Sequence, residues 1–360
     1  MDNPRLEKKV LRVALISRVH RNPYVSLLRD GLMSAELGIS PCIEERFSLR
    51  WLWERRRQVD ILHIHWLELF FLYPTWWRSL RRWLSVVLAL LLARLLGICV
   101  VYTVHNIWQH EGRRAGLVWL GNAAIFALAN AVHVHDARTA ELLARRWRRR
   151  RGVYVVPHGS YIGAYPNECS REEARRVLGL PQEGFIYLFL GRLRPYKGVE
   201  ELLYAFRRLE DEDALLLVAG QVHDPGYEGR IQALAKGDER IRLHLRFVRD
   251  EELQLFLNAC DISVLPYRRV TTSGAALLSF SFGVPIIAPR RGCFVELVGE
   301  EERGLLYDPS DEEGLLRALQ RARQRELAEL RAASRRFAEE LNWRDLARLH
   351  AQAYRQCVKV

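Results

Sequence analysis

The chain of 360 residues has room for about two domains, and its 49% hydrophobic residues allow each domain to bury a core. Its 55 Lys and Arg residues against 43 Asp and Glu residues give a formal net charge of +12, which favours anionic partners such as nucleic acid, lipid headgroups or charged small molecules. The six cysteines have no metal-ligand or redox spacing, which excludes a zinc finger and a dithiol redox motif. The polar start of the chain and the absence of an apolar run of about eighteen residues argue against a signal peptide and a membrane span. We expect a cytoplasmic protein with reduced thiols.

The first half of the chain alternates strand-like and helix-like patterns. The expected strands comprise residues 11–17, 43–47, 61–65, 99–103, 131–135 and 153–156. Helical patterns cover residues 24–37 and 139–147. Strands that alternate with helices predict a parallel sheet with helices on both faces.

Residues 76–96 predict a long amphipathic helix that combines tryptophan with arginine. Such a helix suits the headgroup region of a bilayer, and the basic cluster at residues 145–151 would add attraction to anionic lipid. The residues expected to contact the membrane are Trp76, Trp77, Arg81, Arg82 and Trp83. The alternative is an ordinary amphipathic helix packed on a sheet, which is the interpretation we favour for residues 86–96. We therefore expect a peripheral protein at the inner face of the plasma membrane.

The second half repeats the alternation. The expected strands comprise residues 185–190, 214–219, 240–245, 262–265 and 285–288, with helices at residues 199–209, 251–259 and 274–282. This pattern predicts an α/β fold of two Rossmann-like parallel-sheet domains, residues 1–160 and 161–340, and a last helix in residues 341–360 that crosses back to the first domain. A ligand would lie in the cleft where the carboxyl edges of the two sheets face inward.

Residues 191–198, G-R-L-R-P-Y-K-G, stand between an expected strand and an expected helix. A strand would therefore deliver Arg192 and Lys197 to the carboxyl edge of the sheet, where open α/β sheets bind ligands. Two cations at that edge suit a phosphodiester or a pyrophosphate. Taken alone, these residues are more typical of a solvated basic loop.

A second candidate anion site lies about eighty residues further on. Thr272, Ser273 and Gly274 stand where the next helix pattern begins, and free backbone N–H groups at a helix start bind anions. Plain capping of the helix by Ser273 is the alternative. Two such sites in one domain fit one pyrophosphate. Glu296 would then bind the ribose hydroxyls, and Gly220 ends a strand where a side chain would crowd the nucleotide.

These residues resemble the family 4 type of GT-B glycosyltransferases. The resemblance rests on Gly191-Arg192, Lys197-Gly198, Ser273-Gly274, Phe282-Gly283-Val284-Pro285 and Glu296-Leu297-Val298, and extends more weakly to residues 60–66 and 103–111. It implies that Arg192 and Lys197 bind the donor diphosphate, that Thr272, Ser273 and Gly274 offer amides to it, and that Glu296 lies near the nucleoside.

The chain departs from the family in one respect. The family usually carries two glutamates eight positions apart around this helix, and Thr271 and Ser279 occupy those positions here. The sequence thus resembles a divergent branch, similar also to bacterial exopolysaccharide and lipid-linked-sugar transferases, mannosyltransferases among them. The departure puts the usual retaining mechanism in doubt.

Glycosyl transfer requires neutralisation of the leaving diphosphate, which side-chain cations and helix amides can supply without a metal. No Asp-x-Asp pair is placed for a divalent ion, so we predict no metal and no cofactor. An inverting mechanism needs a base, for which the candidate residues of the first domain are His105, Asn106, His110 and Glu111. Asn22 and Tyr24, in the first strand-to-helix loop, are expected to contact acceptor or donor sugar.

The remaining histidines include two alternating pairs, His63 with His65 and His133 with His135. We interpret His63 and His133 as satisfied core histidines. Metal binding by the histidines is the alternative, although no HExxH or CxxC spacing supports it. The sequence therefore predicts a glycosyltransferase that moves a sugar from GDP-mannose or a UDP-sugar to a lipid-linked or polysaccharide acceptor. A sugar-nucleotide epimerase or phosphorylase is an alternative. The high net charge leaves open a nucleic-acid-binding protein, although no helix-turn-helix, zinc-finger or RNP pattern is present.

Overall fold

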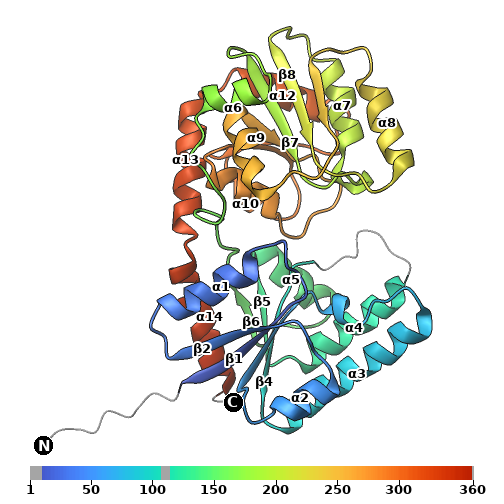
Figure 1. Cartoon of the computed structure of the whole chain (residues 1–360), viewed down its shortest axis with the longest axis vertical. Helices are drawn as coiled ribbons and strands as arrows, with labels where there is room; N and C mark the ends of the chain where they lie inside the picture. Colours follow the sequence, from blue (N-terminus) through green and yellow to red (C-terminus); the bar gives the residue numbers. More distant parts are fainter. Residues whose placement is uncertain (1–9, 107–113, 359–360) are drawn as a thin grey trace, which may run out of the picture. The chain divides into compact units, whose positions relative to one another are not determined.

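The computed structural model describes residues 10–106 and 114–358 (Figure 1). The chain forms two compact units, one of residues 1–159 with 341–360 and one of residues 160–340. Unit 1 and unit 2 each contain one six-stranded parallel sheet. No helix within the described ranges is long and apolar enough to cross a membrane.

The sheet of unit 1 has the strand order β2-β1-β3-β4-β5-β6. Its strands are β1 (Leu11–Ile16), β2 (Ile39–Glu44), β3 (Ile61–His65), β4 (Cys99–Thr103), β5 (Ala131–Val134) and β6 (Val153–Val155). The order reverses between β1 and β3, so the loops that follow these two strands flank a topological switch point, the usual ligand position of open α/β sheets. Strand β2 begins four residues before the predicted strand, because three of its six residues are exposed and its hydrophobic pattern is weak.

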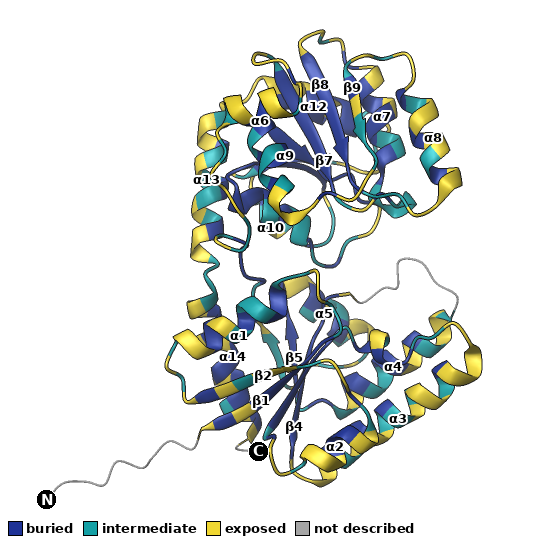
Figure 2. Ribbon diagram, in the orientation of Figure 1, coloured by how far each residue is buried: buried dark blue, intermediate teal, exposed yellow. Residues whose placement is uncertain are grey.

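Helices cover both faces of this sheet (Figures 1 and 2). One face packs against α1 (Tyr24–Ser34) and α14 (Trp343–Val358). The other packs against α2 (Leu49–Arg55), α3 (Trp76–Leu95), α4 (Ala115–Leu128) and α5 (Ala137–Arg146). A short 3-10 helix, η1 (Leu67–Phe70), follows β3.

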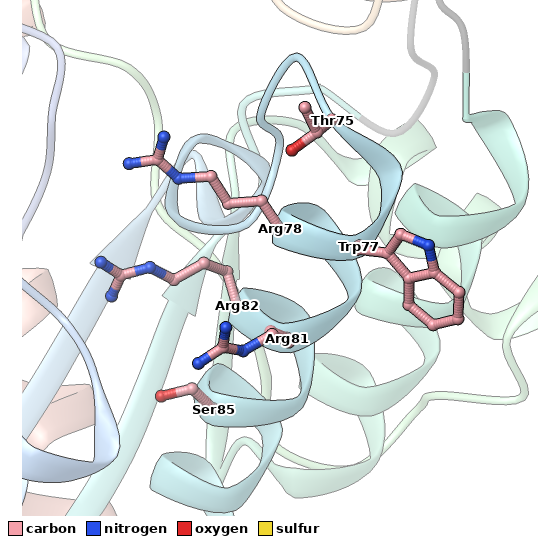
Figure 3. A pocket seen from close by; sticks show the side chains of 6 residues that line it. All are labelled: Thr75, Trp77, Arg78, Arg81, Arg82 and Ser85. Carbon is pink, nitrogen blue, oxygen red and sulfur yellow. The ribbon is translucent and has the colours of Figure 1, made fainter.

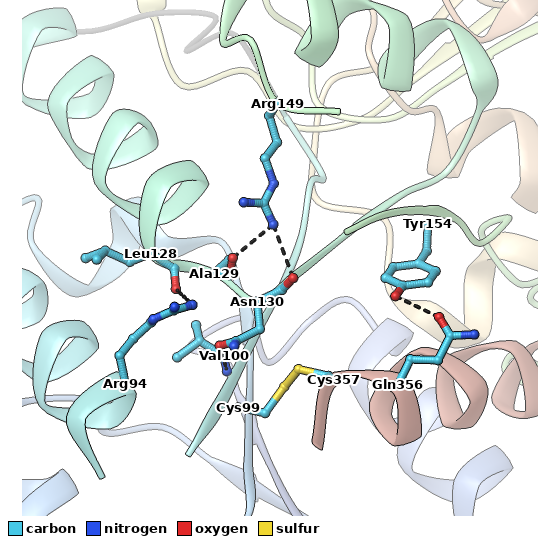
Figure 4. Close-up of a disulfide and its surroundings, with 10 residues drawn as sticks. All are labelled: Arg94, Cys99, Val100, Leu128, Ala129, Asn130, Arg149, Tyr154, Gln356 and Cys357. Atoms are coloured by element: carbon cyan, nitrogen blue, oxygen red, sulfur yellow. Dashed lines mark hydrogen bonds between the residues drawn. A yellow bond between two sulfur atoms is a disulfide. The ribbon is translucent and has the colours of Figure 1, made fainter. Parts of the chain in front are cut away.

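Helix α14 is fastened to the sheet by a disulfide between Cys99 at the start of β4 and Cys357 (Figure 4). The prediction that all six cysteines are reduced is wrong for this pair. The two residues are 258 positions apart in sequence, yet their Cα atoms lie 6.1 Å apart because α14 packs on unit 1. Beside the disulfide, the Tyr154 hydroxyl donates a hydrogen bond to Gln356 at 2.8 Å.

The sheet of unit 2 has the strand order β12-β11-β10-β7-β8-β9. Its strands are β7 (Phe185–Leu190), β8 (Ala214–Ala219), β9 (Ile241–His244), β10 (Ile262–Val264), β11 (Ile286–Pro289) and β12 (Gly304–Tyr307). The order reverses between β7 and β10, as in a dinucleotide-binding fold. Strand β12 was not expected from the sequence, because its four residues follow a charged stretch and are too few to show a period.

The helices of unit 2 again lie on both faces of the sheet (Figure 2). They are α6 (Arg171–Val177), α7 (Val199–Arg207), α8 (Pro225–Ala235), α9 (Leu253–Ala259), α10 (Gly274–Ser281), α11 (Phe294–Val298), α12 (Gly314–Arg323) and α13 (Leu327–Glu340), with 3-10 helices η2 (Pro195–Lys197) and η3 (Asp250–Glu252). The loops β7–α7 and β10–α10 flank the switch point of this sheet.

Candidate active site

Lys197 lies at the switch point of unit 2, at the end of η2. Its ammonium group is 3.6 Å from the ring centroid of Tyr267, a residue of the loop between β10 and α10. The next residue, Gly198, has φ +71, and a Cβ there would stand 2.0 Å from the carbonyl oxygen of Pro266. The β7–α7 and β10–α10 loops therefore approach so closely that residue 198 must be glycine. This close approach holds Lys197 against the segment that leads into α10.

The pKa of Lys197 is lowered to about 7, mainly because burial disfavours the charged ammonium and also because of the nearby Arg194 cation. The residue as a whole is half-buried, while its ammonium end is the enclosed part. A bound diphosphate would favour the charged form and raise this pKa again.

This pKa predicts how donor affinity depends on pH. Below pH 7 the ammonium is charged before the donor binds, whereas above pH 7 it must first take up a proton. The diphosphate of a nucleotide sugar keeps its charge over this range, so we expect the donor dissociation constant to rise about tenfold per pH unit above 7. Calorimetry in two buffers of different ionisation enthalpy should show uptake of about one proton per donor at pH 8 and almost none at pH 6. A flat profile would contradict a direct ion pair, and Lys197→Met should give that flat profile.

The start of α10 forms the facing part of the site. Ser273 caps the helix, its Oγ accepting a hydrogen bond from the amide of Ala276 at 3.2 Å. The hydroxyl of Thr272 is buried and has no hydrogen-bond partner among the described residues. Capping by Ser273 uses only one of the free first-turn amides, so it leaves the others available for the predicted anion site.

The two positions where the family usually has glutamates are buried and serve the fold. Thr271 is 6% exposed. The hydroxyl of Ser279 donates a hydrogen bond to that of Ser263 on β10 at 2.9 Å. Neither residue supplies a carboxylate, so the departure noted in the sequence is a feature of the folded site.

The other predicted donor residues, Arg192, Glu296 and Gly220, also lie in unit 2. Arg192 follows β7 with an exposed side chain, and Glu296 is exposed in the first turn of α11. Gly220 has φ +145, and a Cβ on it would lie 1.8 Å from the carbonyl oxygen of Gly191. Residue 220 must therefore be glycine because a side chain would collide with the backbone at the end of β7. From the sequence, the nucleotide was expected to be the group that excludes a side chain.

In unit 1, the carboxyl edge of the sheet carries a histidine cluster. His105, after β4, stacks on Trp66 with ring centroids 3.8 Å apart and shares a hydrogen bond with His65 at 3.0 Å. Trp66 has φ 48, a left-handed conformation that is rare for a bulky residue. Burial holds the pKa of His105 well below its usual value, so its imidazole is neutral at neutral pH and a weaker proton acceptor than a free histidine.

The predicted acceptor residues lie in the loop after β1. Tyr24 is fully buried and its ring meets those of His105 and His158 edge-on at 4.7 and 4.8 Å. The prediction that Tyr24 contacts a sugar is therefore wrong, because the side chain belongs to the core under α1. Asn22 accepts a hydrogen bond from the amide of Tyr24 at 3.0 Å, which orders the start of α1.

Asn106, another candidate, is exposed in the segment that follows β4. The candidates His110 and Glu111 lie outside the described residues. Trp66 was not among the site residues predicted from the sequence. Its position directly after β3 was the signal in the sequence that could have indicated a place at the carboxyl edge of the sheet.

Helix α3 has three different faces. Ser79, Val86, Ala89, Leu90 and Ala93 are buried against the sheet. A pocket of about 580 Å³ on a second face is lined by Thr75, Trp77, Arg78, Arg81, Arg82 and Ser85, and Figure 3 shows the three arginines extending away from Trp77.

The third face of α3 is an exposed apolar strip of Trp76, Trp77, Leu84, Leu88, Leu91 and Leu95, which we call the α3 strip. Trp77 is 72% exposed and Leu95 is 84% exposed, whereas the predicted contact residue Trp83 is half-buried against the core. The sequence favoured packing of residues 86–96 on the sheet. This packing explains the buried face of α3, but it does not explain the exposed apolar residues of the α3 strip.

The chain is similar to known glycosyltransferases in sequence and to solved structures in fold. Residues 170–340 match the family of glycosyl transferases, group 1. The chain is 29% identical over 345 residues, 93% of its length and 87% of the relative, to a GDP-mannose:glycolipid 4-beta-D-mannosyltransferase of Xanthomonas campestris pv. campestris. Its fold is similar to that of sucrose-phosphate synthase from Thermosynechococcus elongatus, with TM-score 0.73 and 21% identity over 96% of this chain and 98% of that one. It is also similar to HepE of Anabaena in complex with UDP and glucose, with TM-score 0.72 and 13% identity over 97% of this chain and 100% of that one.

The chain is thus a nucleotide-sugar glycosyltransferase with the GT-B fold. Residues 170–340 of unit 2 match group 1 of the glycosyl transferases, in line with the resemblance of the motifs in this part of the sequence. This identification decides in favour of a transferase over the epimerase, phosphorylase and nucleic-acid-binding alternatives.

Proposed function

We propose that the protein transfers mannose from GDP-mannose to a glycolipid acceptor in the synthesis of a cell-surface polysaccharide. The observation that carries this proposal is the likeness to the mannosyltransferase of Xanthomonas campestris, which extends over 93% of this chain and so includes both units. A UDP-sugar is the alternative donor that the sequence left open.

The donor diphosphate would bind at the switch point of unit 2. Lys197 would neutralise one phosphate and the first-turn amides of α10 the other, with the unpaired hydroxyl of Thr272 as a further donor. Arg192 would close the site from solvent, and Glu296 would hold the ribose. In this arrangement the protein itself stabilises the leaving group, so no metal at the diphosphate is needed.

The relative's name specifies a beta-linked product. Formation of a beta linkage from the alpha-linked donor GDP-mannose inverts the anomeric carbon, and inversion requires a base to take the acceptor proton. His105 is the candidate among the described residues, because it follows β4 at the carboxyl edge of the unit 1 sheet. Glu111 and His110 remain candidates from the sequence.

The donor is tested by thermal shift and by turnover. GDP and GDP-mannose should raise the melting temperature more than UDP, ADP and their sugars at equal concentration, since only a ligand that binds the folded state stabilises it. The purified enzyme should then transfer mannose from GDP-mannose to a polyprenyl-diphosphate-linked glycan, and proton NMR of the product should show a beta linkage. Stabilisation by UDP or ADP alone, or transfer from a UDP-sugar alone, would overturn the choice of GDP-mannose.

The glycolipid acceptor implies contact with a membrane, and α3 has the required chemistry. The α3 strip exposes two tryptophans and four leucines along one side of the helix. Arg78, Arg81 and Arg82 are exposed next to it and would meet anionic headgroups. Nearby helices add exposed aromatic rings, Trp53 on α2 and Trp119 on α4.

Removal of these charges should weaken membrane binding. The triple variant Arg78→Ala, Arg81→Ala, Arg82→Ala is expected to reduce cosedimentation with vesicles of phosphatidylcholine and phosphatidylglycerol by about 100-fold, at about 1 kcal/mol per arginine. The matched control removes three arginines of unit 2, Arg317, Arg321 and Arg325, and should change vesicle binding little. Equal losses in both variants would show that net charge, and not α3, determines the attraction.

A further inference from the structure

Three histidines from distant parts of the chain meet inside unit 1. His63 lies on β3, His133 on β5 and His350 on α14, and they are 0%, 0% and 1% exposed. One ring nitrogen of each lies within 4.8 Å of one from each of the others. The ring centroids are 4.7 Å apart for His133 and His350, 5.1 Å for His63 and His133, and 5.5 Å for His63 and His350.

Two of these histidines lack hydrogen-bond partners. Both ring nitrogens of His133 and both of His350 are buried and unpartnered among the described residues. His63 differs, because it is hydrogen-bonded to Tyr354 and to Thr103, each at 2.6 Å. The interpretation of His133 as a satisfied core histidine is therefore wrong, whereas for His63 it is confirmed.

Unpartnered buried nitrogens are costly. Each buried polar group without a partner costs about 1–3 kcal/mol, and folded proteins rarely leave several of them together. A neutral imidazole presents one lone pair, which is the group that coordinates a metal. His133 and His350 each offer one such lone pair, and one nitrogen of each lies within 4.8 Å of one nitrogen of the other and of His63, which indicates a missing ligand that the three rings share.

We propose that His63, His133 and His350 bind one divalent transition-metal ion, zinc in the first instance, which fastens α14 to the sheet of unit 1. Imidazole ligands suit zinc, cobalt, nickel and copper, whereas calcium and magnesium need oxygen ligands. Within the described residues the cluster contains no carboxylate or thiol, so the three imidazoles and a water molecule would complete a four-coordinate site. His63 would give one nitrogen to the ion and keep either Tyr354 or Thr103 as the hydrogen-bond partner that orients its ring.

Binding requires a small contraction of the cluster. Zinc–nitrogen bonds of about 2.0–2.1 Å place tetrahedral ligand atoms roughly 3.4 Å apart, so rotation of the rings must bring the nitrogens together by up to about 1.4 Å. The ion would join residues 63 and 133 to residue 350 and would add to the attachment that the Cys99–Cys357 disulfide makes on the same helix. Its role would be structural, and the proposed metal independence of donor binding concerns a separate site in unit 2.

The metal content of the protein tests the proposal directly. The full chain, purified with an affinity tag free of histidine, should contain about one equivalent of zinc by mass spectrometry after growth in zinc-supplemented medium. Cobalt added to the chelated protein should give the visible absorption of a tetrahedral site, and zinc but not magnesium should raise its melting temperature by several degrees. Less than about a tenth of an equivalent of zinc, together with no cobalt spectrum and no thermal shift, would overturn the proposal.

Variants assign the ligands. His350→Ala and His133→Ala should each lose the bound zinc, whereas His158→Ala removes a buried histidine of the same unit that lies outside the triad and should retain it. If a triad variant folds poorly, the cobalt spectrum of the unmodified chain decides the question without it. Retention of a full equivalent of zinc in a folded His350→Ala protein would place the ion elsewhere and refute the assignment.

Discussion

Lys197→Ala is expected to lower kcat/KM for the nucleotide-sugar donor by about 10²–10³-fold, the usual cost of removing one group that stabilises charge in a transition state. Negative charge grows on the diphosphate as the glycosidic bond breaks, and the ammonium is held at the switch point of unit 2, 3.6 Å from the centroid of Tyr267. Burial makes this cation more effective than one in water, because the local dielectric constant is lower. The loss should appear in both KM and kcat, because the ammonium binds the diphosphate of the intact donor and meets more negative charge as the bond breaks.

Two further variants separate charge from packing. Lys197→Met keeps the length and apolar stem of the side chain, so it should show the same loss of activity with an unchanged melting temperature. Lys236→Ala removes an exposed lysine at the end of α8 in the same unit and should retain activity within about twofold. Full turnover in Lys197→Ala would exclude this residue from the donor site, and normal activity in Lys197→Met alone would assign it a packing role.

Local patterns predicted the two α/β units, because the signals are contained in short segments. The strand from residue 185 to 190 is an apolar run directly before a glycine, and the structure has β7 there. Strand β12 escaped detection because four residues cannot show a period. Strand β2 was expected four residues too late because three of its six residues are exposed. Identification of the family likewise followed from motifs that lie at strand ends.

Properties that depend on distant residues could not be predicted. The loop position of Lys197 was visible in the sequence, but its lowered pKa comes from burial against Tyr267, seventy residues further on. Tyr24 was expected at a sugar because it follows a strand, yet α14 returns from the end of the chain and covers it. The same helix brings Cys357 to Cys99 and His350 to the sheet, pairings that no spacing rule can reveal.

Gly220→Ala should destabilise unit 2 by about 5 kcal/mol or more, in the range that single substitutions reach only by severe steric conflict. The new Cβ would stand 1.8 Å from the carbonyl oxygen of Gly191 and 2.7 Å from its carbonyl carbon. Neither atom can move without breaking the ladder between β7 and β8, in which the amide of Gly191 donates to Ala219 at 3.0 Å. Hydrogen exchange of peptides from β8 should therefore show loss of protection throughout the strand, and the β7–α7 loop that holds Lys197 should be displaced with it.

Gly191→Ala provides a control with matched backbone strain. Gly191 has φ +142, close to the +145 of Gly220, but a Cβ on it would meet no atom within 4 Å. Gly191→Ala should therefore lower the free energy of unfolding by only about 1–3 kcal/mol, the cost of an unfavourable backbone conformation. The difference between the two variants then measures the steric conflict alone, and it should persist when no nucleotide is present. Equal stability of the two alanine variants would show that the ends of β7 and β8 separate without cost. The sequence-based interpretation would then hold, in which a side chain at residue 220 is excluded by the nucleotide.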